Sequence, residues 1–124
     1  MKYNMKLNPS PFEMIKSGEK TIELRLNDEK RQRIKIGDEI EFENTGDSTQ
    51  VINARVLNLH RFCSFDELYK SLSLLKCGYT SDDVCTAHPS DMERYYSVER
   101  QKKYGVVGIE IELITNMTGG QNGI

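Results

Sequence analysis

The sequence predicts a single α+β domain in which a small, curved β-barrel is surrounded by helices. Three observations support this prediction. A chain of 124 residues fits one hydrophobic core and falls short of two domains of ordinary size. Apolar and polar residues alternate near both ends of the chain, as in half-buried strands, and helix-start signals lie between those segments. Because neither a repeat nor a linker divides the chain, strands and helices must share one core, and strands that twist and close form a barrel.

The predicted strands follow from residue alternation. In the clearest of them, Ile22, Leu24 and Leu26 share one face, whereas Thr21, Glu23 and Arg25 share the other. The segment 50–60 is long enough to pair with more than one neighbour in a curved sheet. Residues 44–49 are predicted to form a loop. The strands are expected at residues 3–7, 21–26, 39–43, 50–60 and 104–113.

The first helix is predicted over residues 11–17. Ser10 and Glu13 have the spacing of a capping box, and Pro11 would occupy the first helical position, where its missing N–H costs nothing. Phe12 would lie on the buried face, and Gly18 would end the helix in the left-handed conformation.

Two further helices are predicted in the second half of the chain. Ser64 with Glu67, and Ser90 with Glu93, have capping-box spacing. The second of these helices is expected to break near Ser97 and to resume over residues 98–103. Between the two helices, residues 78–89 are irregular or contain one helical turn starting near residue 81. The tail, 115–124, is expected to be disordered, which leaves a domain of residues 1–114.

Composition excludes several classes of protein. The longest apolar run is far shorter than the roughly 20 residues of a membrane span, and the N-terminus lacks the apolar block of a signal peptide. We therefore expect a cytoplasmic protein with no membrane partner. Three cysteines are an odd number, which favours reduced thiols over a disulfide framework.

The net charge of −2 provides no global field for binding nucleic acid, so such binding would require a local patch. Residues 14–36 carry seven bases against four acids, and residues 94–103 carry four bases against one acid. A solvated surface is the usual interpretation of such runs. Alternatively, the bases would hold RNA phosphates while a tyrosine stacks on an unpaired base. The candidates are Lys30, Arg31, Arg33, Lys35, Arg94, Arg100, Lys102 and Lys103 with Tyr95, Tyr96 or Tyr104.

The candidate site with the most chemical content is the pattern G-x-K-x-x-E-x-R, formed by Gly18, Lys20, Glu23 and Arg25. Side-chain alternation places Glu23 and Arg25 on one face of a strand about 7 Å apart, with Lys20 at the start of that strand. In a cleft, a carboxylate between two cations could accept a hydrogen bond from the amine of a base. The arginine could donate a bidentate pair of hydrogen bonds to a phosphate or to a base edge. The alternative is an ordinary polar strand face with a Glu–Arg pair.

Three segments resemble the ASCH domain, the activating-signal-cointegrator homology domain of the PUA-like superfamily. They are PFEMIKSGEKTIELRL, KIGDEIEF and YYSVERQKKYGVVGIEIEL, and the resemblance extends over about residues 3–113. It implies a β-barrel surrounded by helices and a cleft lined by Lys20, Glu23 and Arg25. It also implies an RNA-related function, with RNA or a nucleotide as the partner.

Some ASCH proteins are enzymes, which leaves a hydrolase as the alternative function. The sequence resembles bacterial acetylcytidine amidohydrolases around Lys20, but Glu23 stands where those enzymes have a threonine nucleophile, and Thr21 is the nearest hydroxyl. A carboxylate cannot simply replace a hydroxyl in acyl transfer, because the intermediate would be an anhydride. A ribonuclease would need a base and a cation at the ribose phosphate, for which Glu23 or Lys20 with Arg25 are candidates.

Two other motifs contain residue types that bind zinc. His60 with Cys63, and Cys85 with His88, have spacings found in zinc sites. Their His-Cys then Cys-His order is not that of a standard finger, and the family resemblance implies no metal. We therefore expect no metal or other cofactor, with the cysteines buried and neutral and the histidines exposed.

Overall fold

The computed structural model describes residues 1–114 and has an α+β fold, as the sequence predicts. Residues 115–124, for which the sequence predicts disorder, lie outside the described residues. None of the helices in the described residues is long and apolar enough to cross a membrane.

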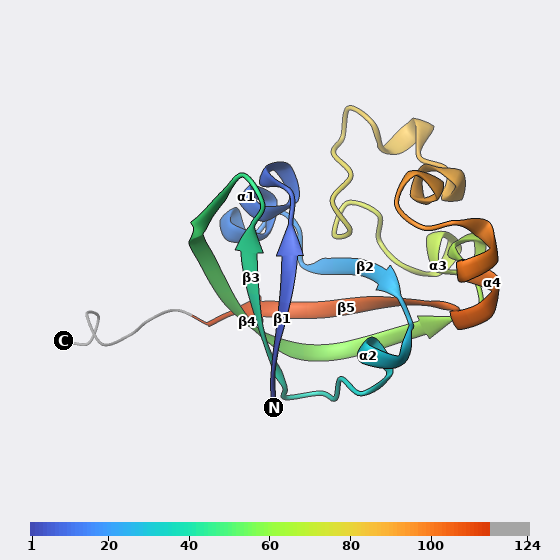
Figure 1. The fold of residues 1–124 in the computed structure, drawn as a ribbon. Coiled ribbons are helices and arrows are strands. Elements are labelled where there is room, and N and C mark those ends of the chain that lie inside the picture. The colour runs from blue at the N-terminus through green and yellow to red at the C-terminus, as the bar shows by residue number, and fades with distance from the viewer. Residues whose placement is uncertain (115–124) are drawn as a thin grey trace.

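A single five-stranded sheet forms the centre of the fold (Figure 1). Its order is β1-β3-β4-β5-β2; β1 and β3 run parallel, and every other neighbouring pair is antiparallel. The long strand β4 pairs with β3 through its first half and with β5 through its second, as the length of its apolar segment predicts. The strands are β1 (Lys2–Leu7), β2 (Ile22–Leu26), β3 (Glu39–Asn44), β4 (Asp47–Phe62) and β5 (Val106–Leu113).

The sheet curls into a half-barrel, which confirms the predicted curved architecture. A register shift in β4 between Val56 and Asn58 accompanies its passage from β3 to β5. Strands β1 and β2 are the two edges of the sheet and are not paired with each other among the described residues. The barrel therefore has an open seam between β1 and β2. The loop expected at 44–49 is shorter than predicted, because strand structure resumes at Asp47.

Helix α1 (Pro9–Ser17) begins earlier than the sequence predicts. Its N-cap is Asn8, and Pro9 already occupies the first helical position, so the predicted capping box at Ser10 and Glu13 is wrong. The predicted C-terminus is confirmed, because Gly18 has the left-handed φ of 87°.

A short helix, α2 (Glu29–Gln32), lies in the polar connection after β2, where the sequence pattern predicts no helix. It is a single turn, and the Asp28 side chain caps it by accepting a hydrogen bond from the Arg31 N–H.

The later helices agree with the sequence in part. In α3 (Phe65–Ser71), Ser64 accepts from the Glu67 N–H, as the predicted cap requires. The box at Ser90 and Glu93 is wrong: η2 (Pro89–Arg94) is a 3₁₀-helix capped by His88 and Asp91. The predicted break at Ser97 is confirmed, because Ser97 caps α4 (Val98–Tyr104). A second 3₁₀ turn, η1 (Val84–Thr86), lies in the irregular segment.

Two apolar clusters lie on opposite faces of the β2–β5 part of the sheet. The first fills the inside of the half-barrel and includes Phe12, Ile40, Phe42, Val107 and Ile109. The second packs Ile22, Leu24, Leu26 and Val106 against α3, Cys77 and Met92. Strand β2 is thus covered on both faces, which explains why its polar face is also withdrawn from solvent.

Gly105 makes the sharp connection from α4 to β5. Its φ of 72° and ψ of −170° form a combination that is open essentially to glycine alone. A Cβ at this position would lie 2.8 Å from the carbonyl oxygen of Phe62, which is a backbone atom and cannot move away freely.

We expect Gly105→Ala to lower the free energy of unfolding by about 1–3 kcal/mol through backbone strain, with the clash adding to this loss. Gly18→Ala is the matched control, because Gly18 also has positive φ but has no atom within 4 Å of its added Cβ. Urea denaturation of both variants measures the difference. Equal losses would show that the approach to Phe62 has no energetic consequence.

Candidate functional site

Lys20 is fixed at the start of β2 by the backbone around it. Gly18 turns the chain out of α1, and the Lys20 N–H donates to the Met14 carbonyl at 3.0 Å. The N–H groups of Thr21 and Ile22 both donate to the Lys76 carbonyl at 2.9 Å. These bonds connect the start of β2 to the segment after α3 and fix where the lysine side chain begins.

Glu23 and Arg25 lie on the inner face of β2. They are directly opposite Ile109 and Val107 on β5, whose side chains belong to the core inside the half-barrel. Because paired residues point to the same side of a sheet, Glu23 and Arg25 also face inward. Glu23 is only 4% exposed, an uncommon environment for a carboxylate.

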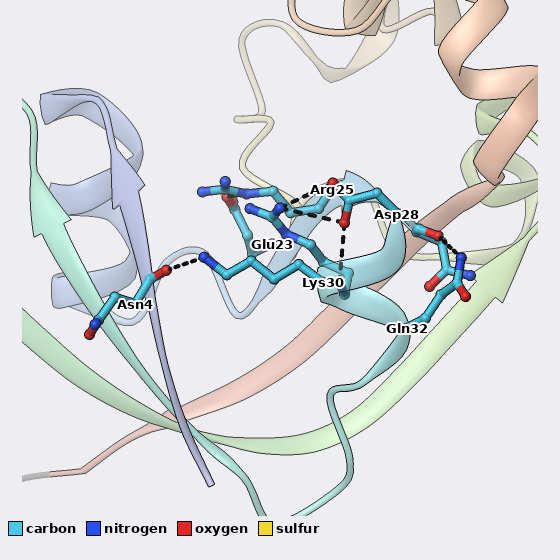
Figure 2. A network of polar contacts seen from close by, with 8 residues as sticks. Asn4, Glu23, Arg25, Asp28, Lys30 and Gln32 are labelled. Atoms are coloured by element: carbon cyan, nitrogen blue, oxygen red, sulfur yellow. Dashed lines mark hydrogen bonds and ion pairs between the residues drawn. The ribbon is translucent and has the colours of Figure 1, made fainter.

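Lys20, Glu23 and Arg25 form a compact ion cluster. The Lys20 Nζ lies 2.9 Å from Glu23 Oε1, and the Arg25 Nε donates to Glu23 Oε2 at 2.7 Å. Figure 2 shows the Arg25 contact. Each oxygen of the carboxylate thus has its own cationic partner, which is what a buried charge needs to be tolerated.

The same cluster bridges the open seam of the barrel. Arg25 Nη2 donates to the Lys6 carbonyl on β1 at 2.7 Å, and Lys30 Nζ donates to the Asn4 carbonyl at 3.0 Å (Figure 2). Carbonyl oxygens at alternate positions of an edge strand point away from the sheet. Two basic side chains therefore satisfy two carbonyl groups on the edge of β1 that no strand of residues 1–114 pairs with.

The cations determine the ionisation of Glu23. Burial alone would raise the pKa of Glu23, but the charges and hydrogen bonds of Lys20 and Arg25 outweigh burial, and the pKa lies below its ordinary value. For Arg25, burial would lower the pKa, yet the neighbouring Glu23 carboxylate keeps it above its ordinary value. Glu23 and Arg25 are therefore both ionised at neutral pH.

The ion cluster lies on the floor of a cleft with a volume of about 660 Å³. One wall comes from the end of β1 and from α1, and the other from the segment between α3 and α4 (Figure 1, yellow to orange). Leu24 also lines the floor, and Tyr95 and Tyr96 line the second wall. Tyr95 is 58% exposed, so its ring is accessible from the cleft.

The backbone N–H and C=O of Leu24 lie at this edge of the sheet and have no hydrogen-bond partner among residues 1–114. The Thr21 carbonyl accepts from the Ile111 N–H, and the Asn27 N–H donates to the Gly105 carbonyl, so odd-numbered residues of this segment bond to β5. Leu24 is opposite Gly108 in a non-hydrogen-bonded pair, and its N–H and C=O point away from β5.

A chain of hydrogen bonds holds the second wall in place. Tyr79 Oη donates to Asp91 Oδ2 at 2.6 Å, and Tyr69 Oη, on α3, lies 2.7 Å from Tyr79 Oη. Asp91 Oδ2 also accepts from the His88 N–H at 3.1 Å. Burial and the bond to Asp91 raise the pKa of Tyr79. Since Tyr69 also packs against the second core cluster, the wall is anchored to α3.

The structure separates the candidate site residues into three groups. Lys20, Glu23 and Arg25 meet in the cleft, where Arg94, Tyr95 and Tyr96 join them. Lys30 and Arg31 line an adjoining cavity. The third group lines neither cavity: Thr21, Arg33, Lys35, Arg100, Lys102, Lys103 and Tyr104. Of these, Tyr104 packs against the second core cluster.

Sequence reasoning missed several cleft residues. Lys6 and Asn8 line the first wall, and Tyr79, Asp83 and Asp91 line the second. No local pattern marks them, because they come from segments far apart in the chain. Asp91 alone had a local signal, because Pro89 marks the start of η2 and Asp91 caps that helix.

The two motifs with zinc-site spacing do not come together as a metal site in the described residues. Across residues 1–114, no three His, Cys, Asp or Glu side chains are placed to hold a metal ion. His60 Nε2 instead lies 2.8 Å from Glu110 Oε1, and His88 Nδ1 contacts Ser90 at the start of η2. The expectation of buried cysteines is wrong for Cys63 and Cys85, which are exposed, whereas Cys77 is buried.

Comparison with known proteins identifies the family. The ASCH domain model matches residues 5–115. The chain belongs to the ASCH domain family. ASCH domains have a PUA-like fold that is generally linked to RNA binding. No curated protein matched this chain.

Solved structures share the fold of this chain. The hypothetical protein PH0355 is 39% identical, with a TM-score of 0.74, and the match covers 92% of this chain and 100% of that one. A Pyrococcus furiosus protein solved by solution NMR is 37% identical, with a TM-score of 0.67 and coverage of 92% and 98%. A mutant of ZmASCH from Zymomonas mobilis is 14% identical, with a TM-score of 0.63 and coverage of 94% and 77%, and shares the fold.

The ion cluster predicts a specific pH dependence of stability. Because the pKa of Glu23 is lowered on folding, the unfolded chain binds more protons at mildly acidic pH. The stabilisation is therefore complete above the unfolded pKa of about 4.3 and is lost as the pH falls through the folded value. Glu23→Gln leaves two buried cations unpaired and should lower the free energy of unfolding by about 3–5 kcal/mol at pH 7.

Urea denaturation between pH 7 and pH 2 tests this dependence. The difference between the parent and Glu23→Gln should shrink as the pH falls. Glu39→Gln is the matched control, because Glu39 pairs with Arg55 at 3.7 Å with each side chain nearly half exposed. It should cost less than about 1 kcal/mol. A Glu23→Gln loss that stays constant with pH would contradict the lowered pKa.

Proposed function

We propose that this ASCH domain binds single-stranded RNA and receives one unpaired nucleotide or modified base in the cleft above Lys20, Glu23 and Arg25. The observation that supports this most is the ion cluster itself. A buried carboxylate with a cation on each oxygen lies at the floor of an open cleft, and all three residues of the cluster line that cleft.

The floor offers donors and acceptors that suit a base edge. The Glu23 carboxylate can accept from an exocyclic amine, and Arg25 can donate to a carbonyl or ring nitrogen. The free N–H and C=O of Leu24 add a donor beside an acceptor, the arrangement that complements the Watson–Crick edge of a base. These groups are held by β2, so they are organised before a ligand arrives.

The size and walls of the cleft also favour a nucleotide. Its volume of about 660 Å³ is in the range of pockets that hold small ligands. Tyr95 provides an exposed ring, and the Arg94 guanidinium lies 5.9 Å from the centre of that ring. Unpaired RNA bases commonly stack on aromatic side chains and arginine planes.

A hydrolase acting on acetylated cytidine or on RNA has less support. Thr21, the hydroxyl nearest to Glu23 in the sequence, does not line the cleft. Both oxygens of Glu23 are occupied by cations, and its lowered pKa makes it a poor proton donor at neutral pH. Burial raises the pKa of the Cys77 thiol to about 11, so its thiolate is scarce at neutral pH.

Replacement of Tyr95 tests the proposal with little risk to the fold, because this ring is largely exposed. Tyr95→Ala should weaken binding of single-stranded RNA about tenfold or more, the range expected for losing one stacked base. Tyr95→Phe retains the ring and should bind nearly as well as the parent. Fluorescence anisotropy with a labelled oligonucleotide pool of random sequence measures both.

Two results would contradict the proposal. Equal binding by the parent and Tyr95→Ala would show that RNA does not bind in the cleft. Absence of binding by the parent would show that RNA is not the ligand. The same samples, incubated with the labelled RNA and with acetylated cytidine, show whether either is consumed. Turnover would favour the hydrolase.

A further inference from the structure

A second cavity adjoins the cleft at the barrel seam and is lined by residues from both sides of the seam. It has a volume of about 470 Å³ and shares Lys6 and Arg25 with the cleft. Because these two residues line both cavities, a chain-like ligand in the cleft would reach the second cavity by passing Arg25. The remaining charged lining residues are Lys30, Arg31, Glu41 and Glu43.

The cations of this cavity are only partly neutralised. Arg25 is paired with Glu23, and Arg31 Nη1 lies 3.2 Å from Asp28 Oδ2. Lys6 and Lys30 have no carboxylate within ion-pair distance in residues 1–114, and Lys30 instead donates to the Asn4 carbonyl (Figure 2). Two lysine charges therefore remain available to an anion.

Arg31 provides a second indication that the cavity binds a ligand. Its Nε is buried and has no hydrogen-bond partner among the described residues, although the other end of the guanidinium contacts Asp28. A buried N–H without an acceptor costs about 1–3 kcal/mol, so such groups are rare unless they serve a function. Because Arg31 lines the cavity, an oxygen-rich ligand there could supply the missing acceptor once the guanidinium turns toward it.

The carboxylates restrict what that ligand can be. Glu41 is paired with Lys2, at 3.4 Å, whereas Glu43 has no such cationic partner in residues 1–114. A bare inorganic anion would be repelled by Glu43. A ribose phosphate fits both signs of charge, because its phosphate accepts from the cations and its 2′-hydroxyl can donate to a carboxylate.

We propose that the second cavity binds the ribose phosphate of the nucleotide that adjoins the one in the cleft. This inference rests on the proposed function of the cleft. Lys30, Arg31 and Lys6 contact the phosphate, and Glu43 accepts from the ribose 2′-hydroxyl. The ligand is then a ribonucleotide strand of at least two residues, and a free nucleoside occupies only half of the site.

Calorimetric titration with nucleosides and dinucleoside monophosphates tests this. The probes are the ribonucleoside that the parent binds most tightly and the dinucleoside monophosphates that contain it, in ribo and deoxy forms. The parent should bind the best ribonucleotide dimer at least tenfold more tightly than the nucleoside. Lys30→Met should lose most of that gain while its affinity for the nucleoside is unchanged.

Matched variants separate the proposed contacts. Arg33→Met removes a positive charge three residues away, from an exposed side chain that lines neither cavity, and should retain the whole gain. Arg31→Lys keeps the charge but removes the Nε donor. This variant should lose part of the gain in affinity for the dimer. Glu43→Gln should reduce the preference for the ribo over the deoxy dimer. Circular dichroism of each variant confirms folding.

The outcomes distinguish this inference from the proposed function. If the parent binds the nucleoside but the dimer binds no more tightly, or if Lys30→Met keeps the gain, the second cavity has no such role and the cleft proposal stands. If the parent binds neither probe, the cleft proposal fails and this inference fails with it.

Discussion

The carboxylate of Glu23, held between Lys20 and Arg25, is the interaction on which the rest of this structure depends. Strand β2 is covered on both faces, so its inner polar residues are buried and need charged partners. Pairing with Glu23 allows Arg25 to remain ionised there and to reach across to the Lys6 carbonyl. One ion cluster thereby neutralises a buried charge and connects the two edges of the half-barrel.

The open seam explains why the candidate site lies where it does. A closed barrel would have satisfied the polar edge groups of β1 and β2 with each other. Here side chains satisfy part of β1, and the N–H and C=O of Leu24 are left at the edge of β2. The wall carrying Tyr79 and Asp91 stands over this edge, so unpaired polar groups, charges and an aromatic ring surround one cleft.

The sequence was sufficient for what depends on local periodicity and family resemblance. Alternation correctly placed Glu23 and Arg25 on one face of a strand, and the ASCH resemblance is confirmed by the family match. The sequence was insufficient where contacts between distant segments determine helix boundaries and the lining of the cleft. Pro9 begins α1 before the expected box at Ser10, and the contact of Tyr79 with Asp91 joins segments with no shared pattern. Whether the cleft binds RNA stays a prediction.

The most direct test of the central claim is an NMR titration that follows the Arg25 Nε–H signal and the backbone amides as single-stranded RNA is added. The account predicts that the Arg25 signal and the amides of residues 20–25 and 94–96 shift together and saturate together. Shifts confined to α4, around the exposed Arg100 and Lys103, with the Arg25 signal unchanged, would contradict it.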